Sequence, residues 1–190
     1  MLKKKTIEGL AARGLFALSA LLWVGCARPA YHPGRLALKL PPDALGTSVS
    51  LQQHLRVERE GRVDELDVVL EVDSQRLDLI ALALGQRVLS LHYDGRTLQS
   101  WRNPMLPPQL RDEDILEDVQ LTFWPADAIQ RALPTGWHIE EKGLQRTLSL
   151  DNKPVMVIVY SGEPHWTGKI ELVNLRYNYR LTIESVSNDS

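Results

Sequence analysis

Hydrophobic and polar residues alternate along most of the chain after residue 48. In Val49–Val57 the odd-numbered positions would share one face of a strand, and all of them except Gln53 are apolar. This is the pattern of a half-buried strand. Turn residues separate further runs of this kind. These runs lie at Leu66–Asp73, Arg76–Leu84, Val88–Tyr93 and Leu98–Trp101. Closely spaced strands joined by tight turns predict an antiparallel meander.

The pattern changes after the proline-rich stretch Asn103–Leu110. Asp112–Leu121 begins with carboxylates, which favour a first helical turn, and it continues with apolar residues on one face. Pro125–Leu133 has proline in its first turn and stops at Pro134, so it predicts a second short helix.

Alternating runs resume after these helices and continue almost to the end of the chain. They lie at Trp137–Glu141, Gln145–Leu150, Val155–Tyr160, Trp166–Leu175 and Tyr179–Ser185. We therefore expect a mainly β (α+β) domain over residues 35–190: a single curved antiparallel sheet, a half-barrel, with two short helices on its concave face.

The first 25 residues have the order of a secretory signal. Lysines come first, a mostly apolar run Leu10–Val24 follows, and Gly25 precedes Cys26. Arg13 splits the apolar run, which leaves too few residues for a membrane span. We predict a signal peptide over residues 1–25 and a short proline-bearing tether over residues 26–34.

Cys26 is the only cysteine of the chain, so it has no disulfide partner within it. Leu22–Cys26 resembles the lipobox of bacterial lipoproteins, although that pattern prefers leucine where this chain has Trp23. The resemblance implies that the export and lipoprotein-processing machinery makes Cys26 a lipid-attachment site, and acyl chains then hold the protein on a membrane. Ala27 follows in place of aspartate, which by the same resemblance implies the periplasmic face of the outer membrane. An ordinary signal beside an unrelated cysteine is the alternative.

The charge balance argues against a nucleic-acid partner. The whole chain has a net charge of −2, and removal of the basic leader makes the mature chain more acidic. Nucleic-acid binding requires a basic stripe, and no run of like charge in the mature chain points to such a partner.

No set of residues points to catalysis, a metal or a cofactor. The five histidines lie in separate elements without metal-ligand spacing, and no Gly-x-Ser-x-Gly motif occurs. The carboxylates Asp112, Glu113 and Asp114 are explained by a solvated helix start. We therefore expect no enzyme activity.

Two groups of apolar residues are candidate binding elements. One group suits either a packed core or the wall of a wide ligand cavity, and it consists of Trp101, Phe123, Trp124, Trp137 and Trp166. The other is Met105 with Leu106, in the loop before the first helix. These two residues either touch membrane or cargo, or tuck under the helix.

The second half of the chain resembles a known bacterial family. The resemblance is carried by Leu121–Ile129 (Leu-Thr-Phe-Trp-Pro-Ala-Asp-Ala-Ile) and by Leu106-Pro-Pro before it. Weaker pieces follow in order: Gly-Trp at 136, Arg-Thr-Leu at 146, Val-Ile-Val-Tyr at 157 and Leu-Val-Asn at 172. From Leu106 to the end the chain resembles DUF3261, a lipoprotein family of unknown function that is often encoded beside aryl-polyene biosynthesis genes. That family is similar in architecture to the lipoprotein carriers LolA and LolB, half-barrels that shelter acyl chains.

These observations lead to one expected function and two alternatives. The expected function is that of an outer-membrane-anchored periplasmic protein that binds a lipid, a lipoprotein's acyl chains or an aryl polyene in an apolar groove, without chemistry. The first alternative is a structural or assembly partner of an envelope complex, with a fully packed core and no ligand. The second is an enzyme acting on pigment or lipid intermediates, which would need clustered carboxylate and histidine side chains.

Overall fold

The computed structural model describes residues 35–107 and 110–187. The predicted signal peptide, Cys26 and the tether lie outside the described residues, so their assignment stays a prediction.

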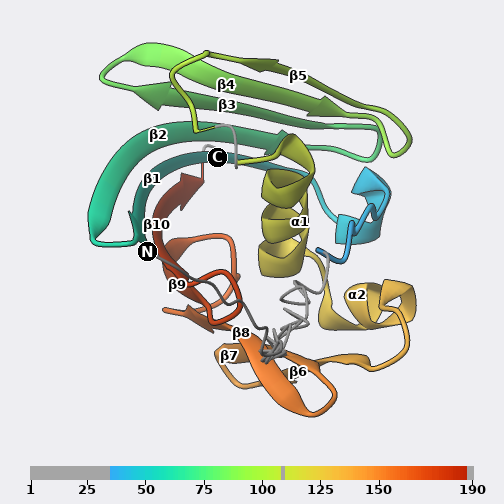
Figure 1. The fold of residues 1–190 in the computed structure, drawn as a ribbon. Coiled ribbons are helices and arrows are strands. Elements are labelled where there is room, and N and C mark those ends of the chain that lie inside the picture. The colour runs from blue at the N-terminus through green and yellow to red at the C-terminus, as the bar shows by residue number, and fades with distance from the viewer. Residues whose placement is uncertain (1–34, 108–109, 188–190) are drawn as a thin grey trace, which may run out of the picture. The chain divides into compact units, whose positions relative to one another are not determined.

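One antiparallel sheet contains all ten strands of the described chain (Figure 1). The first five are β1 (Val49–Arg59), β2 (Arg62–Val72), β3 (Leu77–Ala83), β4 (Gln86–Tyr93) and β5 (Leu98–Arg102). The last five are β6 (Trp137–Lys142), β7 (Gln145–Leu150), β8 (Lys153–Tyr160), β9 (Gly168–Asn174) and β10 (Tyr179–Ser187). A 3-10 turn, η1 (Pro42–Leu45), precedes the first strand.

The order of the strands is β5-β4-β3-β2-β1-β10-β9-β8-β7-β6. Consecutive strands pair within each half, and the last strand β10 closes the sheet against the first strand β1, with Leu55 opposite Ile183. Strands β5 and β6 are therefore the two edges, although they are neighbours in strand number.

The two helices form the connection between these edges. Helix α1 (Asp112–Phe123) and helix α2 (Ala126–Ala132) follow β5 and precede β6. Because the connection runs from one edge of a curved sheet to the other, it crosses the concave face, and Figure 1 shows α1 inside the curve. Helix α2 continues to the edge strand β6, against which it packs.

The core lies between α1 and the concave face. In most of the strands alternate residues point inward and are buried, among them Leu51 and Leu70, which are paired in register on β1 and β2. The edge strands contribute less, since β5 has no buried residue and β6 has Ile139 alone. From the helical connection, Leu116, Leu121 and Trp124 complete the core with 0–1% of their surface exposed.

The predicted fold class is confirmed: a single curved antiparallel sheet with two short helices. The boundaries differ in detail. The β1–β2 hairpin is longer than predicted and turns at Glu60 and Gly61, α1 reaches Phe123, and β9 starts at Gly168, so that Trp166 lies in the preceding turn. Among the described residues no helix is long and apolar enough to cross a bilayer.

Trp124 is the side chain whose loss we expect to cost most in the core. It is 0% exposed, and its indole N–H donates to the Pro41 carbonyl at 3.2 Å. Replacing Trp124 by alanine leaves a large cavity and should lower the free energy of unfolding by about 3–5 kcal/mol, measured by urea denaturation followed by circular dichroism. Trp101 is 43% exposed, and Trp101→Ala should cost no more than about 1 kcal/mol. Equal losses in the two variants would contradict this assignment.

Candidate functional site

Helix α1 carries polar side chains into the interior, which makes the surroundings of this helix the most distinctive part of the molecule. Glu117 is 4% exposed and Gln120 is 0% exposed. Buried polar groups are destabilising unless they are hydrogen-bonded. Their partners therefore show what holds the helix in place.

The chain segment just before η1 supplies these partners. The backbone N–H of Ala37 donates to the Glu117 carboxylate at 2.8 Å. Gln120 both accepts from the Leu40 N–H at 3.0 Å and donates to the Leu40 carbonyl at 2.8 Å. Trp124, the residue that follows α1, is bonded to Pro41. Two side chains of α1 and one at its C-terminal cap, spaced three and four residues apart, therefore hold the backbone of residues 37–41. We call residues 35–41 the strap.

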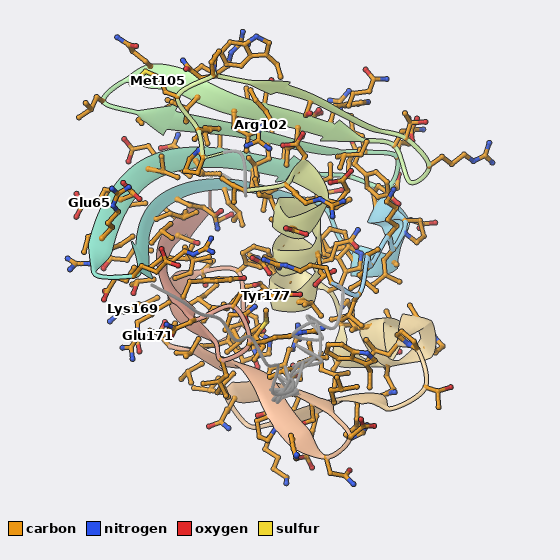
Figure 2. The ribbon with its side chains drawn as sticks, in the orientation of Figure 1. Glu65, Arg102, Met105, Lys169, Glu171 and Tyr177 are labelled. Carbon is orange, nitrogen blue, oxygen red and sulfur yellow. The ribbon has the colours of Figure 1, made fainter. Side chains whose placement is uncertain are left out.

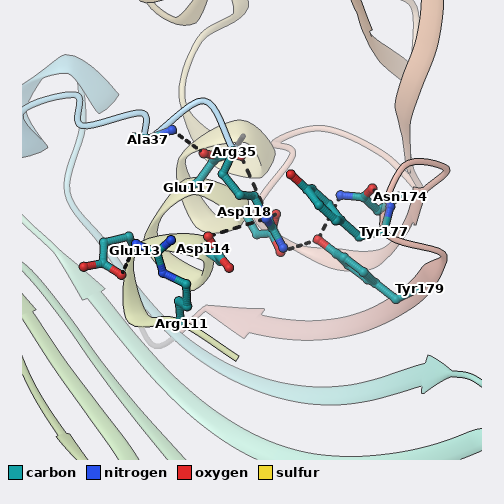
Figure 3. A network of polar contacts seen from close by, with 10 residues as sticks. All are labelled: Arg35, Ala37, Arg111, Glu113, Asp114, Glu117, Asp118, Asn174, Tyr177 and Tyr179. Carbon is teal, nitrogen blue, oxygen red and sulfur yellow. Dashed lines mark hydrogen bonds and ion pairs between the residues drawn. The ribbon is translucent and has the colours of Figure 1, made fainter. Parts of the chain in front are cut away.

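Arg35, at the start of the strap, is the cation of this site (Figure 3). Its guanidinium lies 2.9 Å from Asp118, 3.5 Å from Asp114 and 3.8 Å from Glu117, so it faces three carboxylates of α1. Only 17% of its side chain is exposed. Removing one partner from a buried charge cluster typically costs about 3–5 kcal/mol.

Two tyrosines of the β9–β10 hairpin complete the network. The Tyr179 hydroxyl donates to Asp118 at 2.5 Å and accepts from the Asn174 amide at 3.1 Å. The Arg35 guanidinium also lies over the Tyr177 ring at 4.4 Å, a cation–π contact. Figure 3 shows the strap, α1 and this hairpin meeting at Arg35.

The network shifts the acidity of its members. Burial raises the pKa of the Glu117 carboxyl to about 7, although Arg35 opposes the shift. Burial likewise raises the pKa of Asp118, against Arg35 and the hydrogen bond from Tyr179. Burial disfavours the Arg35 cation, but Asp118, Tyr179, Asp114 and Glu117 outweigh this effect and raise its pKa.

Two further arginines fix the ends of α1. Arg102 of β5 pairs with Asp112 at 3.0 Å and donates to the Leu110 carbonyl at the helix start. Arg146 of β7 donates to the Leu121 and Thr122 carbonyls at 2.7 and 3.2 Å, where the last turn of a helix has free acceptors. The Tyr160 hydroxyl donates to the same Thr122 carbonyl at 2.7 Å.

The concave face is not covered completely. Four apolar side chains of its inner surface are only partly buried: Leu55, Val57, Leu66 and Leu181. Leu55 stands opposite Leu66 on β2, and Val57 stands opposite Leu181 on β10, so the four form one continuous patch. We call it the concave patch.

Two prominent hollows lie in the described surface, and no residue of α1 lines either of them. One, of about 690 Å³, is lined by β1, β2, β9 and β10 with Leu82 of β3. The other, of about 520 Å³, lies at the tips of the β1–β2 and β9–β10 hairpins. In the described ranges, 35–107 and 110–187, no three His, Cys, Asp or Glu side chains converge as ligands for a metal ion.

The five aromatic residues predicted as a cavity wall occupy different surroundings. Trp124 and Phe123 belong to the buried core, at 0% and 6% exposure. Trp101 stands on the edge strand β5 under the Arg87 guanidinium, at 4.5 Å. Trp137 and Trp166 are partly buried against the core, Trp137 with Arg176 at 5.1 Å over its ring. None of the five lines either hollow.

The loop residues Met105 and Leu106 are neighbours in sequence but differ in exposure. Met105 is 89% exposed, whereas Leu106 packs against the core. Burial under the helix is therefore excluded for Met105, and its contact with membrane or cargo stays a prediction.

Sequence reasoning missed Arg35, Glu117, Asp118 and Tyr179. It also explained Asp112 and Asp114 as solvated, which is wrong: both side chains are largely buried, at 18% and 13% exposure, and each pairs with an arginine. Only Glu113, 43% exposed, fits that explanation. The available signal was the recurrence of carboxylates at 114, 117 and 118, which share one side of a helix.

The raised pKa of Glu117 predicts a pH dependence of stability. The folded pKa of about 7 lies above the ordinary value of 4.5, so the folded state binds more protons than the unfolded state between these values. The free energy of unfolding should therefore fall as the pH rises from 4.5 to about 7, by up to about 3 kcal/mol from this group.

Urea denaturation at a series of pH values measures this slope, and Glu117→Gln should flatten it. Glu113→Gln is the matched control on the same helix. The pKa of Glu113 is lowered by a backbone hydrogen bond and by Arg111, so its effect lies at more acidic pH. An unchanged slope in Glu117→Gln would overturn the role given to this carboxyl.

Two solved structures are similar in fold. One is a chain of the Pseudomonas aeruginosa MucA/MucB complex, 16% identical, with a TM-score of 0.46 over 78% of this chain. This chain covers 55% of that one, about half its length. The other is a DUF1329 family protein from Desulfovibrio piger, 12% identical, with a TM-score of 0.41 over 80% of this chain and 88% of that one. Neither likeness bears on function.

No curated protein matches the sequence. A family model does match, over residues 50–187, and its description is "Protein of unknown function (DUF3261)". The match spans nine of the ten strands in full, most of β1 and both helices, and it includes the Phe123-Trp124-Pro125 segment at the junction of the helices. The chain therefore belongs to the DUF3261 family.

Proposed function

We propose that this protein is an envelope lipoprotein that reversibly binds a lipid or acyl-type ligand, an aryl polyene among the candidates, on the concave patch beside α1. The ligand undergoes no covalent change. The observation that carries the proposal is the concave patch itself, which leaves inward-facing leucines of three strands partly uncovered. Apolar surface of this kind stabilises a bound chain by about 25 cal/mol per Å² removed from water.

The location follows from the predicted N-terminus. In this proposal the lipid on Cys26 anchors the protein to the periplasmic face of the outer membrane. Two or three acyl chains are sufficient for stable attachment without a spanning helix. A ligand carried in the bilayer would then be close to the domain that binds it.

A second candidate function is that of a structural partner in an envelope complex. A filled core around Trp124 favours it, because a docking protein needs no internal cavity. The strands β5 and β6 favour it as well, since each has a paired neighbour on one side only and an edge strand can pair with another chain. Affinity purification from membranes distinguishes the two functions: a stoichiometric protein partner with no lipid supports docking.

Ligand binding should depend on the concave patch. Mass spectrometry of solvent extracts from a secreted form lacking residues 1–26 should recover a defined lipid or polyene at near-equal molar amount. Leu181→Gln should weaken retention about tenfold, because one leucine contact contributes about 1.5 kcal/mol. Val186→Gln is the matched control, since Val186 lies on the same strand, faces outward and is 68% exposed. Equal lipid content in both variants, or an empty parent protein, would contradict the proposal.

Lipid attachment is tested separately. Cells supplied with an alkyne-tagged fatty acid should label the parent protein, and Cys26→Ser should abolish the label because no other thiol exists. Detergent-free fractionation should find the parent protein with membranes. A label that persists on Cys26→Ser, or that is absent from the parent, would refute the anchor and leave the ligand question open.

A further inference from the structure

One end of the sheet exposes apolar side chains that the ligand site does not use. Leu84, in the turn between β3 and β4, is fully exposed at 102%, and Met105, in the loop after β5, is 89% exposed. Figure 2 shows Met105 at the outer end of these strands. Burying either side chain would be favourable, and nothing in the described chain buries them.

The two side chains belong to one end of the sheet. Strand β3 ends and β4 begins at the Ala83–Gln86 pair, beside Leu84. The loop after β5 joins the same end, because the Asn103 N–H donates to the Val88 carbonyl at 2.8 Å. We call Leu84, Arg87, Trp101 and Met105 the tip.

An aromatic ring and a cation complete the tip. Trp101 is 43% exposed, and the Arg87 guanidinium lies 4.5 Å from its ring centroid. An exposed tryptophan stacked with arginine has an apolar body and a charged rim, which is the combination found at membrane–water interfaces.

The tip itself carries a positive charge, that of Arg87. No Asp or Glu occurs in residues 79–93 or 95–107, which contain the strands and turns that form it. On the neighbouring strand β2, Asp67 stands opposite Leu82 and is hydrogen-bonded to His54 at 3.0 Å. Glu65, two residues earlier on β2, is exposed and stands opposite Arg56 of β1. Arg102 is bound to Asp112, so Arg87 is the cation left at the surface of the tip.

We propose that the tip contacts the surface of a lipid bilayer with anionic headgroups. Leu84 and Met105 insert into the acyl boundary, Trp101 lies at headgroup level, and Arg87 pairs with lipid phosphate. A protein partner fits less well, since protein hot spots are packed clusters in pockets, whereas these side chains extend separately from two turns.

The proposal rests on the membrane location given above and does not require the concave patch to bind a ligand. At most about 30 Å of extended chain separates Cys26 from Arg35, so a lipid anchor would keep the bilayer within reach of the domain.

The test uses the full lipidated chain in vesicles of phosphatidylethanolamine and phosphatidylglycerol. An environment-sensitive fluorophore is attached to a single new thiol in Leu84→Cys or Met105→Cys. Thr97→Cys is the matched control, exposed in the turn at the opposite end of β4 and β5. We expect a blue shift and quenching by bromine-labelled acyl chains at positions 84 and 105, and neither at 97. Both signals should weaken at least about twofold in phosphatidylcholine vesicles or with Arg87→Glu.

Several outcomes would overturn the proposal. The first is a fluorophore spectrum typical of water at positions 84 and 105, and the second is equal insertion at position 97. The third is a blue shift that appears without vesicles as the protein concentration rises, which would indicate a second copy of the chain as the occupant. Signals that are insensitive to lipid charge would overturn the role of Arg87. The unsubstituted chain should take no fluorophore, because its only thiol is lipidated; labelling there would refute the anchor independently of the tip.

Discussion

The fold depends on one topological constraint: residues 103–136 must run from one edge of the ten-stranded sheet to the other. A connection on the convex side would leave the inward-facing leucines in water, so the chain crosses the concave face and α1 becomes the core of the half-barrel. The cost of this position is that the helix has no solvated face wide enough for its own polar residues. The polar residues of α1 therefore need hydrogen-bond and ion-pair partners from other parts of the chain, and these partners give the molecule its most distinctive contacts.

Three arginines from distant parts of the chain meet this demand. Arg102 pairs with the start of α1, Arg35 with the carboxylates along its side, and Arg146 with the carbonyls at its end. Each lies where the helix presents negative charge or free acceptors, and the partners include the first-turn acids Asp112 and Asp114. The strap adds backbone hydrogen bonds to Glu117 and Gln120. A mainly polar set of contacts therefore fixes the position of the helix over an otherwise apolar sheet.

The sequence was sufficient to predict the strands and the helical connection, because alternation of period two and the breaks at Pro125 and Pro134 are local signals. It was not sufficient for the helix contacts. Arg35 and Asp118 are 83 positions apart, and nothing local tells which carboxylates of a short helix turn inward. Trp101 and Trp124 looked alike as cavity candidates for the same reason, since exposure depends on whether a residue lies at an edge or under the curve. Their surroundings became distinguishable only when the order of the strands was known.

The same network decides which part of the concave face a ligand could use. Displacing α1 would expose Leu116, Leu121 and Trp124 and would separate Arg35 from its carboxylates. At about 1.5–3 kcal/mol for each large apolar side chain, the apolar loss alone is on the order of 5–9 kcal/mol. An acyl chain already surrounded by lipid gains little by moving to another apolar site, so it cannot supply this energy. Binding is therefore feasible only where the inner face is uncovered beforehand, at Leu55, Val57, Leu66 and Leu181, with α1 as a fixed wall.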